Sequence, residues 1–236
     1  MTSRADRERW IVRACVACAL GTLVVAVGEF LMLYAPGGGY TPAEGHRNFA
    51  GVSPGRSTLG FYLGVLGVPI YLLGYWQIAR ALEPAGRRLA SAVRWLGSYC
   101  TVIGNVWLGS NAYLAAVVRE RERAPTEFRP ALDRLVAEMD ALADPLLQII
   151  RAILLAVSLL YVYGVLTGRS DYPRWMAIFS PFLLLVLIFA CYLAAPAIGQ
   201  YIVPDAMNVA HCAFFTLSAF ALGSAYARRR GPEAAA

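Results

Sequence analysis

Residues 10–35 read WIVRACVACALGTLVVAVGEFLMLYA, and this stretch decides the class of the protein. It contains two charged residues, Arg13 and Glu29, and as a helix it is long enough to cross about 30 Å of hydrocarbon. It is too long for the apolar core of a cleavable signal, and no small-residue cleavage motif accompanies it. We therefore expect residues 10–35 to form the first membrane helix.

The composition extends this reading to the whole chain. Of its 236 residues, 58% are hydrophobic and 15% are charged, whereas about 25% are charged in ordinary soluble domains. The sequence predicts an all-α fold, a polytopic membrane helix bundle in one domain, residues 1–230, followed by a disordered tail, 231–236. The expected membrane segments are 10–35, 57–82, 89–118, 145–166, 172–195 and 204–226.

Glycine and proline mark close packing and breaks in these segments. In the second segment, Gly60 and Gly64 form a small-xxx-small pair that permits close approach of another helix. Pro69 is expected to kink this segment, and Pro181 lies within the fifth. The glycine-rich second segment is also a candidate contact for a homo-oligomer.

A polar stretch separates the third and fourth segments. Residues 126–142 are expected to form an amphipathic helix, either on the membrane surface or as a connector packed on its neighbours. Asp144 and Pro145 would then be the N-cap and first position of the fourth segment. The apolar residues at helical spacing are Phe128, Leu132, Leu135, Val136, Met139 and Leu142.

The arginines predict the orientation. If the N-terminus is cytoplasmic, thirteen arginines lie on that side and seven on the other, counting those near segment ends. Cytoplasmic loops carry the excess of basic residues. We therefore expect a multi-pass protein of the cell (inner) membrane with both termini in the cytoplasm.

Polar side chains within the membrane segments point to one pocket. Charged groups at this depth are costly unless they pair or face water, and Glu29 and Arg151 are the two clear cases. At 1.5 Å per residue, most of the polar groups lie about 6–10 Å inside the outer ends of their helices. The polar neighbours are Asn105, which lies deeper, and Asn111, Gln148, Asn208 and His211. Four separate helices thus predict a pocket near the non-cytoplasmic face.

The simplest arrangement of this pocket pairs Glu29 with Arg151, while the amides and His211 complete the hydrogen bonds. Three alternatives remain open at this point. The ion pair is purely structural; Arg151 snorkels outward and leaves Glu29 protonated; or His211 is a satisfied core histidine rather than a functional one.

Several chemistries are excluded or poorly supported. All 21 basic residues are arginine, so no lysine imine can form. The two histidines lack metal-ligand spacing, and we expect no metal and no cofactor. The five cysteines all lie in apolar stretches, which is typical of packing residues. The basic charge belongs to helix ends and does not indicate nucleic acid.

Several short sequence motifs also resemble those of a known protein family. These are Gly28-Glu29-Phe30-Leu31 running into Pro36, Pro69-Ile70-Tyr71-Leu72-Leu73-Gly74, Tyr172-Pro173-Arg174-Trp175, Pro181, and Asn208. Together they resemble an uncharacterised family of bacterial six-helix integral membrane proteins. The resemblance implies a six-helix fold over most of the chain and implies no activity.

Three functions are compatible with these residues. The first is an acid/base enzyme, an isomerase, cyclase or hydrolase, on an isoprenoid- or lipid-like substrate, with Glu29 and His211 as the catalytic pair and Arg151 holding an anionic group. The second is a small-molecule or proton-coupled transporter, and the third a non-catalytic partner subunit. The lipid bilayer is the expected partner, and a lipophilic small molecule is the candidate ligand.

Overall fold

The computed structural model describes residues 4–36, 46–199 and 201–231, and over these residues the chain is helical and contains no strand. The expected all-α bundle is confirmed. The long helical elements are α1 (Arg4–Leu33), α3 (Pro54–Gly67) with α4 (Ile70–Leu82), α5 (Arg87–Arg123), α6 (Arg129–Leu166) and α9 (Ala206–Arg230). The shorter ones are α2 (Arg47–Ala50), η2 (Glu83–Ala85), η3 (Arg174–Phe179), α7 (Pro181–Ala194), α8 (Pro196–Gly199) and η4 (Val203–Asp205).

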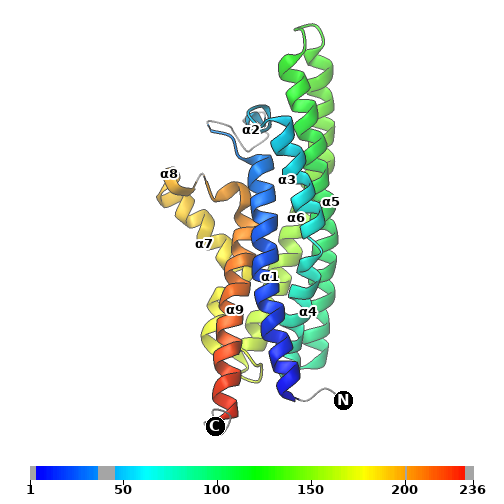
Figure 1. Cartoon of the computed structure of the whole chain (residues 1–236). Coiled ribbons are helices and arrows are strands. Elements are labelled where there is room, and N and C mark those ends of the chain that lie inside the picture. Colours follow the sequence, from blue (N-terminus) through cyan, green and yellow to red (C-terminus); the bar gives the residue numbers. More distant parts are fainter. Residues whose placement is uncertain (1–3, 37–45, 200, 232–236) are drawn as a thin grey trace.

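The long helices run up and down one axis (Figure 1). The start of α1 and the end of α9 lie together at one end of the bundle, which we call the terminal end. The connection between α5 and α6, residues 124–128, lies at the opposite end, which we call the hairpin end. Of the expected tail 231–236, all but Gly231 lies outside the described residues.

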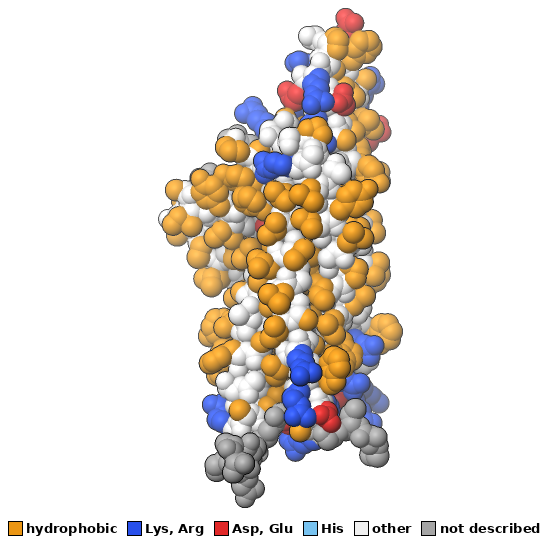
Figure 2. All heavy atoms as spheres, in the orientation of Figure 1, with side chains coloured by type: hydrophobic (Ala, Val, Ile, Leu, Met, Phe, Trp, Pro, Cys, Tyr) orange, Lys and Arg blue, Asp and Glu red, His pale blue; other side chains and the backbone are white. Residues whose placement is uncertain are grey.

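The surface has the pattern of a membrane protein. Figure 2 shows a broad belt of hydrophobic side chains around the middle, whereas arginines gather at the two ends. Within the described residues, five helical spans are long and apolar enough to cross a membrane, and the shorter α7 is also apolar. Large apolar side chains stand exposed on this belt, including Leu20, Leu66 and Leu193. In water such a surface would be an aggregation hazard, whereas lipid tails solvate it.

One expected boundary is wrong. Residues 126–142 and the fourth segment do not form two helices, because α6 continues through Asp144 and Pro145 without a break. Pro145 cannot donate a backbone hydrogen bond, yet α6 is supported along its length by α5. Near the hairpin end Arg121 forms an ion pair with Asp133 at 3.6 Å. This packing holds both halves of α6 in line, so the amphipathic stretch packs on its neighbour and is not a separate surface helix.

The length of α5 and α6 explains the charged tip. At 1.5 Å per residue these helices reach about 55 Å, well beyond the roughly 30 Å of hydrocarbon. They project past the other helices at the hairpin end (Figure 1). The arginines there interleave with acids, as in the pair of Arg123 with Glu120 at 3.1 Å.

The fifth expected segment, 172–195, is not one continuous helix. It divides into η3 and α7, because Ser180 and Pro181 form a new N-cap and first turn. The Ser180 hydroxyl accepts a hydrogen bond from the backbone N–H of Leu183, and Pro181 thus starts a helix rather than interrupting one. With 14 residues, α7 reaches only about 21 Å.

Glycines let α1 and α3 approach closely, as the sequence predicts. A Cβ atom added to Gly28 would lie 2.8 Å from the backbone nitrogen of Gly64, and one added to Gly60 would collide with the backbone of Gly28. The close contact is therefore made within one chain, and a homo-oligomer through this segment stays an untested prediction. The helix is interrupted at Pro69, between α3 and α4, where the sequence predicts a kink.

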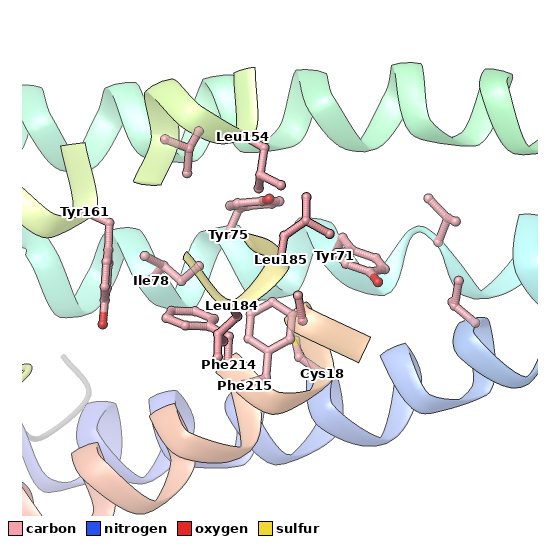
Figure 3. Packing of buried hydrophobic residues seen from close by; sticks show 14 of the residues in the cluster. Cys18, Tyr71, Tyr75, Ile78, Leu154, Tyr161, Leu184, Leu185, Phe214 and Phe215 are labelled. Carbon is pink, nitrogen blue, oxygen red and sulfur yellow. The ribbon is translucent and has the colours of Figure 1, made fainter. Parts of the chain in front are cut away.

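Aromatic side chains fill the bundle toward the terminal end. Figure 3 shows Tyr161, Phe214 and Phe215 packed with Leu184 between α4, α6, α7 and α9. The Phe214 ring meets those of Tyr161 and Phe215 edge-on, with centroids 5.3 and 5.5 Å apart. This region is a closed core.

Replacing Gly60 by alanine tests the α1–α3 contact. The added methyl meets backbone that cannot rotate away, so we expect a loss of about 1–3 kcal/mol in unfolding free energy. Thermal denaturation in detergent measures it. Gly223→Ala is the control, because a Cβ there meets no heavy atom within 4 Å. Equal melting of the two variants would contradict the contact.

Candidate functional site

A cavity of about 360 Å³ lies between the helices in the half of the bundle nearer the hairpin end. It is lined from α1, α4, α5, α6, α7 and α9. Five of the seven sequence-predicted site residues line it: Glu29, Asn111, Arg151, Asn208 and His211. Side chains that are far apart in the sequence therefore share one space, as their common depth predicts.

Asn208 is the centre of the polar part of this cavity. Its side-chain amide nitrogen donates hydrogen bonds to the carboxyl groups of Glu29 and Asp205, the latter at 2.7 Å. Its amide oxygen accepts a hydrogen bond from the hydroxyl of Tyr71 at 2.5 Å. All four side chains are buried. The amide uses both of its N–H groups and its oxygen, which fixes its orientation.

Glu29 and Asp205 form a carboxyl pair. Both accept a hydrogen bond from the same amide nitrogen of Asn208, so the two buried groups lie close together. Two carboxyl groups held this close do not both ionise readily, because like charges repel. Such a pair can hold one proton between its members. This is the chemistry of a proton donor and acceptor.

His211 lies one helical turn further along α9. Its Nδ1 is 2.8 Å from the backbone oxygen of Met207, which can only accept, so Nδ1 carries the hydrogen. Its Nε2 is 3.0 Å from the hydroxyl of Tyr75, which donates to it in the neutral imidazole. His211 is buried and satisfied on both nitrogens. The tyrosine hydroxyl connects it to the cavity.

Arg151 does not form the expected ion pair with Glu29. Among the described residues its hydrogen-bond partner is the side-chain oxygen of Gln148, at 3.4 Å. Gln148 in turn donates to Asp144 at 3.2 Å. All three side chains are exposed and lie on one face of α6. The outward-pointing alternative for Arg151 therefore fits the structure.

The remaining predicted residues have smaller roles in the geometry. Asn111 lines the cavity, and its amide donates to the backbone oxygen of Trp107 in its own helix at 2.9 Å. Gln148 and Asn105 do not line the cavity. The side-chain oxygen of Asn105 is buried without a hydrogen-bond partner. These two residues are therefore not brought into the site.

The mouth of the cavity lies between α6 and α7. Three of its lining residues are exposed, Asp144 and Arg151 from α6 and Phe189 from α7. At the hairpin end α7 diverges from the bundle (Figure 1). The neighbouring exposed side chains are apolar, such as Ile149 and Leu187. The cavity thus opens sideways, toward the exposed apolar belt.

A roof closes the cavity at the hairpin end. His46, Asn48 and Phe49 are buried there. The Nε2 atom of His46 lies 3.3 Å from a carboxyl oxygen of Asp140 on α6. Asn48 donates to the backbone oxygen of Leu33 at 3.2 Å. These contacts tie α2 to both α6 and the end of α1.

The sequence-based reading missed Asp205, Tyr71 and Tyr75. Asp205 precedes a helix, which is the ordinary place of an N-cap, yet its side chain makes no capping bond. The two tyrosines are four residues apart in α4, and they face Asn208 and His211, which are three apart in α9. That matched helical spacing is the signal that could have found them.

A model of a family of unknown function, DUF6796, matches residues 8–225. The chain belongs to this family. The resemblance to an uncharacterised family is confirmed to that extent. No curated protein and no solved structure matches the chain. Because the family description gives no activity, the function of this DUF6796 member is argued from its site.

No group of three or more His, Cys, Asp and Glu side chains is placed to hold a metal ion in the part of the chain that the structure describes. The described cysteines are all free thiols, and Cys15, Cys18 and Cys100 are buried among packing side chains. The buried acid–base groups nearest Asn208 are the carboxyl groups of Glu29 and Asp205 and the Tyr75–His211 contact, whereas His46 and Asp140 lie at the hairpin end of the cavity.

Replacing Asn208 by leucine tests the centre of the site. The change leaves two buried carboxyl groups without their shared donor, so we expect a loss of about 1–3 kcal/mol in stability. Asn105→Leu is the control, because it removes an amide oxygen that has no partner. Denaturation midpoints in detergent compare the two. If Asn208→Leu melts with Asn105→Leu, the amide does not hold the carboxyl pair.

Proposed function

We propose that this protein is a membrane enzyme that performs acid–base chemistry on a lipophilic, isoprenoid- or lipid-like substrate: an isomerisation, cyclisation or hydrolysis. One observation carries the proposal. A cavity lined by Glu29, whose carboxyl group shares the Asn208 amide with the buried Asp205, opens between α6 and α7 onto the apolar belt. A substrate dissolved in the bilayer can reach such a site without crossing water.

The shape of the cavity supports an amphipathic substrate. Its walls are largely apolar, with Trp107, Leu147 and Leu185 among them. Arg151 stands at the mouth, where a guanidinium can hold an anionic group of the substrate. An anionic group is disfavoured next to the carboxyl pair. The apolar part of the substrate would therefore enter first, with its reacting carbon or oxygen near Glu29.

The proposed proton path uses both polar clusters. The carboxyl pair gives a proton to one atom of the substrate. Another substrate atom gives a proton to the oxygen of Tyr75 as the Tyr75 hydroxyl proton moves to Nε2 of His211. His211 would then act as the base through Tyr75 rather than by direct contact.

The closed core disfavours the transporter. A transporter exposes its site to each face of the membrane in turn. Toward the terminal end, however, the cavity is lined by the buried Tyr75, and Phe214 and Phe215 are fully buried in the closed core. A non-catalytic partner subunit would have no need of a cavity that opens onto the apolar belt beside buried carboxyl groups.

Glu29→Gln tests the chemistry. Purified protein in detergent is incubated with the total lipid extract of its host membranes, and mass spectrometry detects the species consumed and formed. We expect the variant to slow turnover by about 100-fold or more, because positioned proton transfer contributes about 10²–10⁴. Wild-type turnover by the variant would rule out Glu29. Solute-dependent proton flux in liposomes without any lipid conversion would establish the transporter instead.

Gly104→Leu separates loss of the cavity from loss of the fold. Gly104 lines the cavity, and a Cβ there meets no heavy atom within 4 Å. A leucine side chain would occupy space that the substrate needs, so we expect turnover to be abolished at unchanged melting temperature. Gly223→Leu, on α9 away from the cavity, should keep both. Full activity in Gly104→Leu would show that the reaction occurs elsewhere.

We further propose that the terminal end faces the cytoplasm. This end carries most of the arginines near the helix ends, among them Arg7, Arg80 and Arg228, and positive residues are retained on the cytoplasmic side. A reporter that fluoresces only in the cytoplasm, fused after Arg230, should be bright, whereas one inserted at Pro125 should be dark. The reverse pattern would invert the proposed orientation and place the cavity in the cytoplasmic leaflet.

A further inference from the structure

A second pocket, of about 500 Å³, lies at the terminal end, far from the cavity. It is formed by the loop between α6 and η3 and by the last turns of α9. Three arginines and one acid line it: Arg174, Arg228, Arg229 and Asp171. We call it the basic pocket.

The floor of the basic pocket is held in place. The backbone N–H of Asp171 donates to the backbone oxygen of Ala81 at the end of α4, at 2.8 Å. One carboxyl oxygen of Asp171 accepts from the Tyr226 hydroxyl at 3.0 Å, and the other from Arg229 at 2.6 Å. Three segments of chain, α4, α9 and the loop before η3, thus meet at one aspartate, and this aspartate neutralises Arg229.

The other two arginines are left without an acidic partner. Within the described residues, neither Arg174 nor Arg228 makes an ion pair or a hydrogen bond, and both are exposed. The guanidinium of Arg174 lies over Gly168, where an added Cβ would come within 2.9 Å of it. Gly168 also has a φ of +70°, a conformation that favours glycine. The loop therefore makes room for this guanidinium beside Arg228.

The surroundings indicate what the two charges meet. Trp175 and Ile178 follow Arg174 in η3, and they are 42% and 66% exposed. Tryptophan at such a place is typical of the membrane–water interface. A ligand with an anionic phosphate for the guanidinium groups and acyl chains for this apolar surface satisfies both halves.

We propose that the basic pocket binds the phosphate of an anionic phospholipid head group between Arg174 and Arg228, with the acyl chains along Trp175 and Ile178. The site does not depend on the proposed enzymatic activity, because it lies at the opposite end and shares no residue with the cavity. Its lipid is a structural or regulatory ligand rather than the substrate.

The test uses the double variant Arg174→Gln, Arg228→Gln in detergent-purified full-length protein. Native mass spectrometry with phosphatidylglycerol and with phosphatidylcholine measures lipid binding. The control variant is Arg87→Gln, Arg88→Gln, which removes the same charge from exposed positions at the same end. We expect the pocket variant to bind phosphatidylglycerol about tenfold more weakly than the control, because charge-assisted contacts to phosphate are specific in position.

Each other outcome overturns the proposal. An equal loss in both double variants would show that only the total charge of this end matters, as membrane orientation alone requires. Equal binding of phosphatidylglycerol and phosphatidylcholine by the wild type would exclude an anionic-lipid site. If inorganic phosphate displaces the lipid and raises the melting temperature as much as the lipid does, the pocket binds a free anion and not a head group.

Discussion

Hydrocarbon offers no water to a buried polar group, so each such group in this bundle needs a partner from the protein. The amide of Asn208 meets this constraint for three others at once: Glu29 on α1, Asp205 before α9, and Tyr71 on α4. Without that amide the two carboxyl groups would face each other across apolar walls. This one side chain thus links α1, α4 and α9 at the cavity.

The same constraint separates the bundle into two halves with different tasks. Toward the terminal end the space between helices is filled with aromatic rings such as Phe214 and Phe215, which need no polar partner. Toward the hairpin end, α7 is too short to cover the bundle and diverges from it. Space remains there, and the polar groups collect beside it. The packed half toward the terminal end holds the helices that line the cavity in the other half. A binding site needs such a rigid scaffold.

The all-α class and the approximate positions of the apolar helices could be predicted from the length of the apolar stretches and their helical spacing. The wrong helix boundaries lie at prolines. A helix is interrupted at Pro69, where a kink is expected, whereas α6 continues through Pro145 and α7 begins at Pro181. A proline removes one hydrogen bond wherever it stands. Whether the helix then breaks depends on its neighbours, because α6 is held straight by α5 along its length. The sequence shows where a proline removes a hydrogen bond, but it does not show which neighbouring helix supports that position.

For the site residues, the sequence determines the depth of a side chain along its helix, but it does not determine the direction in which that side chain points. Depth in the membrane follows from counting residues along a helix, and Glu29, Asn208 and His211 do meet at one level. The direction around the helix axis depends on how the helices rotate against each other, and here Arg151 faces outward while Glu29 faces Asn208. The expected pairing of Arg151 with Glu29 is therefore wrong, although Arg151 does line the same cavity. The difference matters chemically, because a guanidinium neutralises a carboxylate, whereas a second carboxyl group does not. In the structure Glu29 shares the Asn208 amide with Asp205 and has no arginine beside it among the described residues, which is the arrangement that the proposed acid–base role needs.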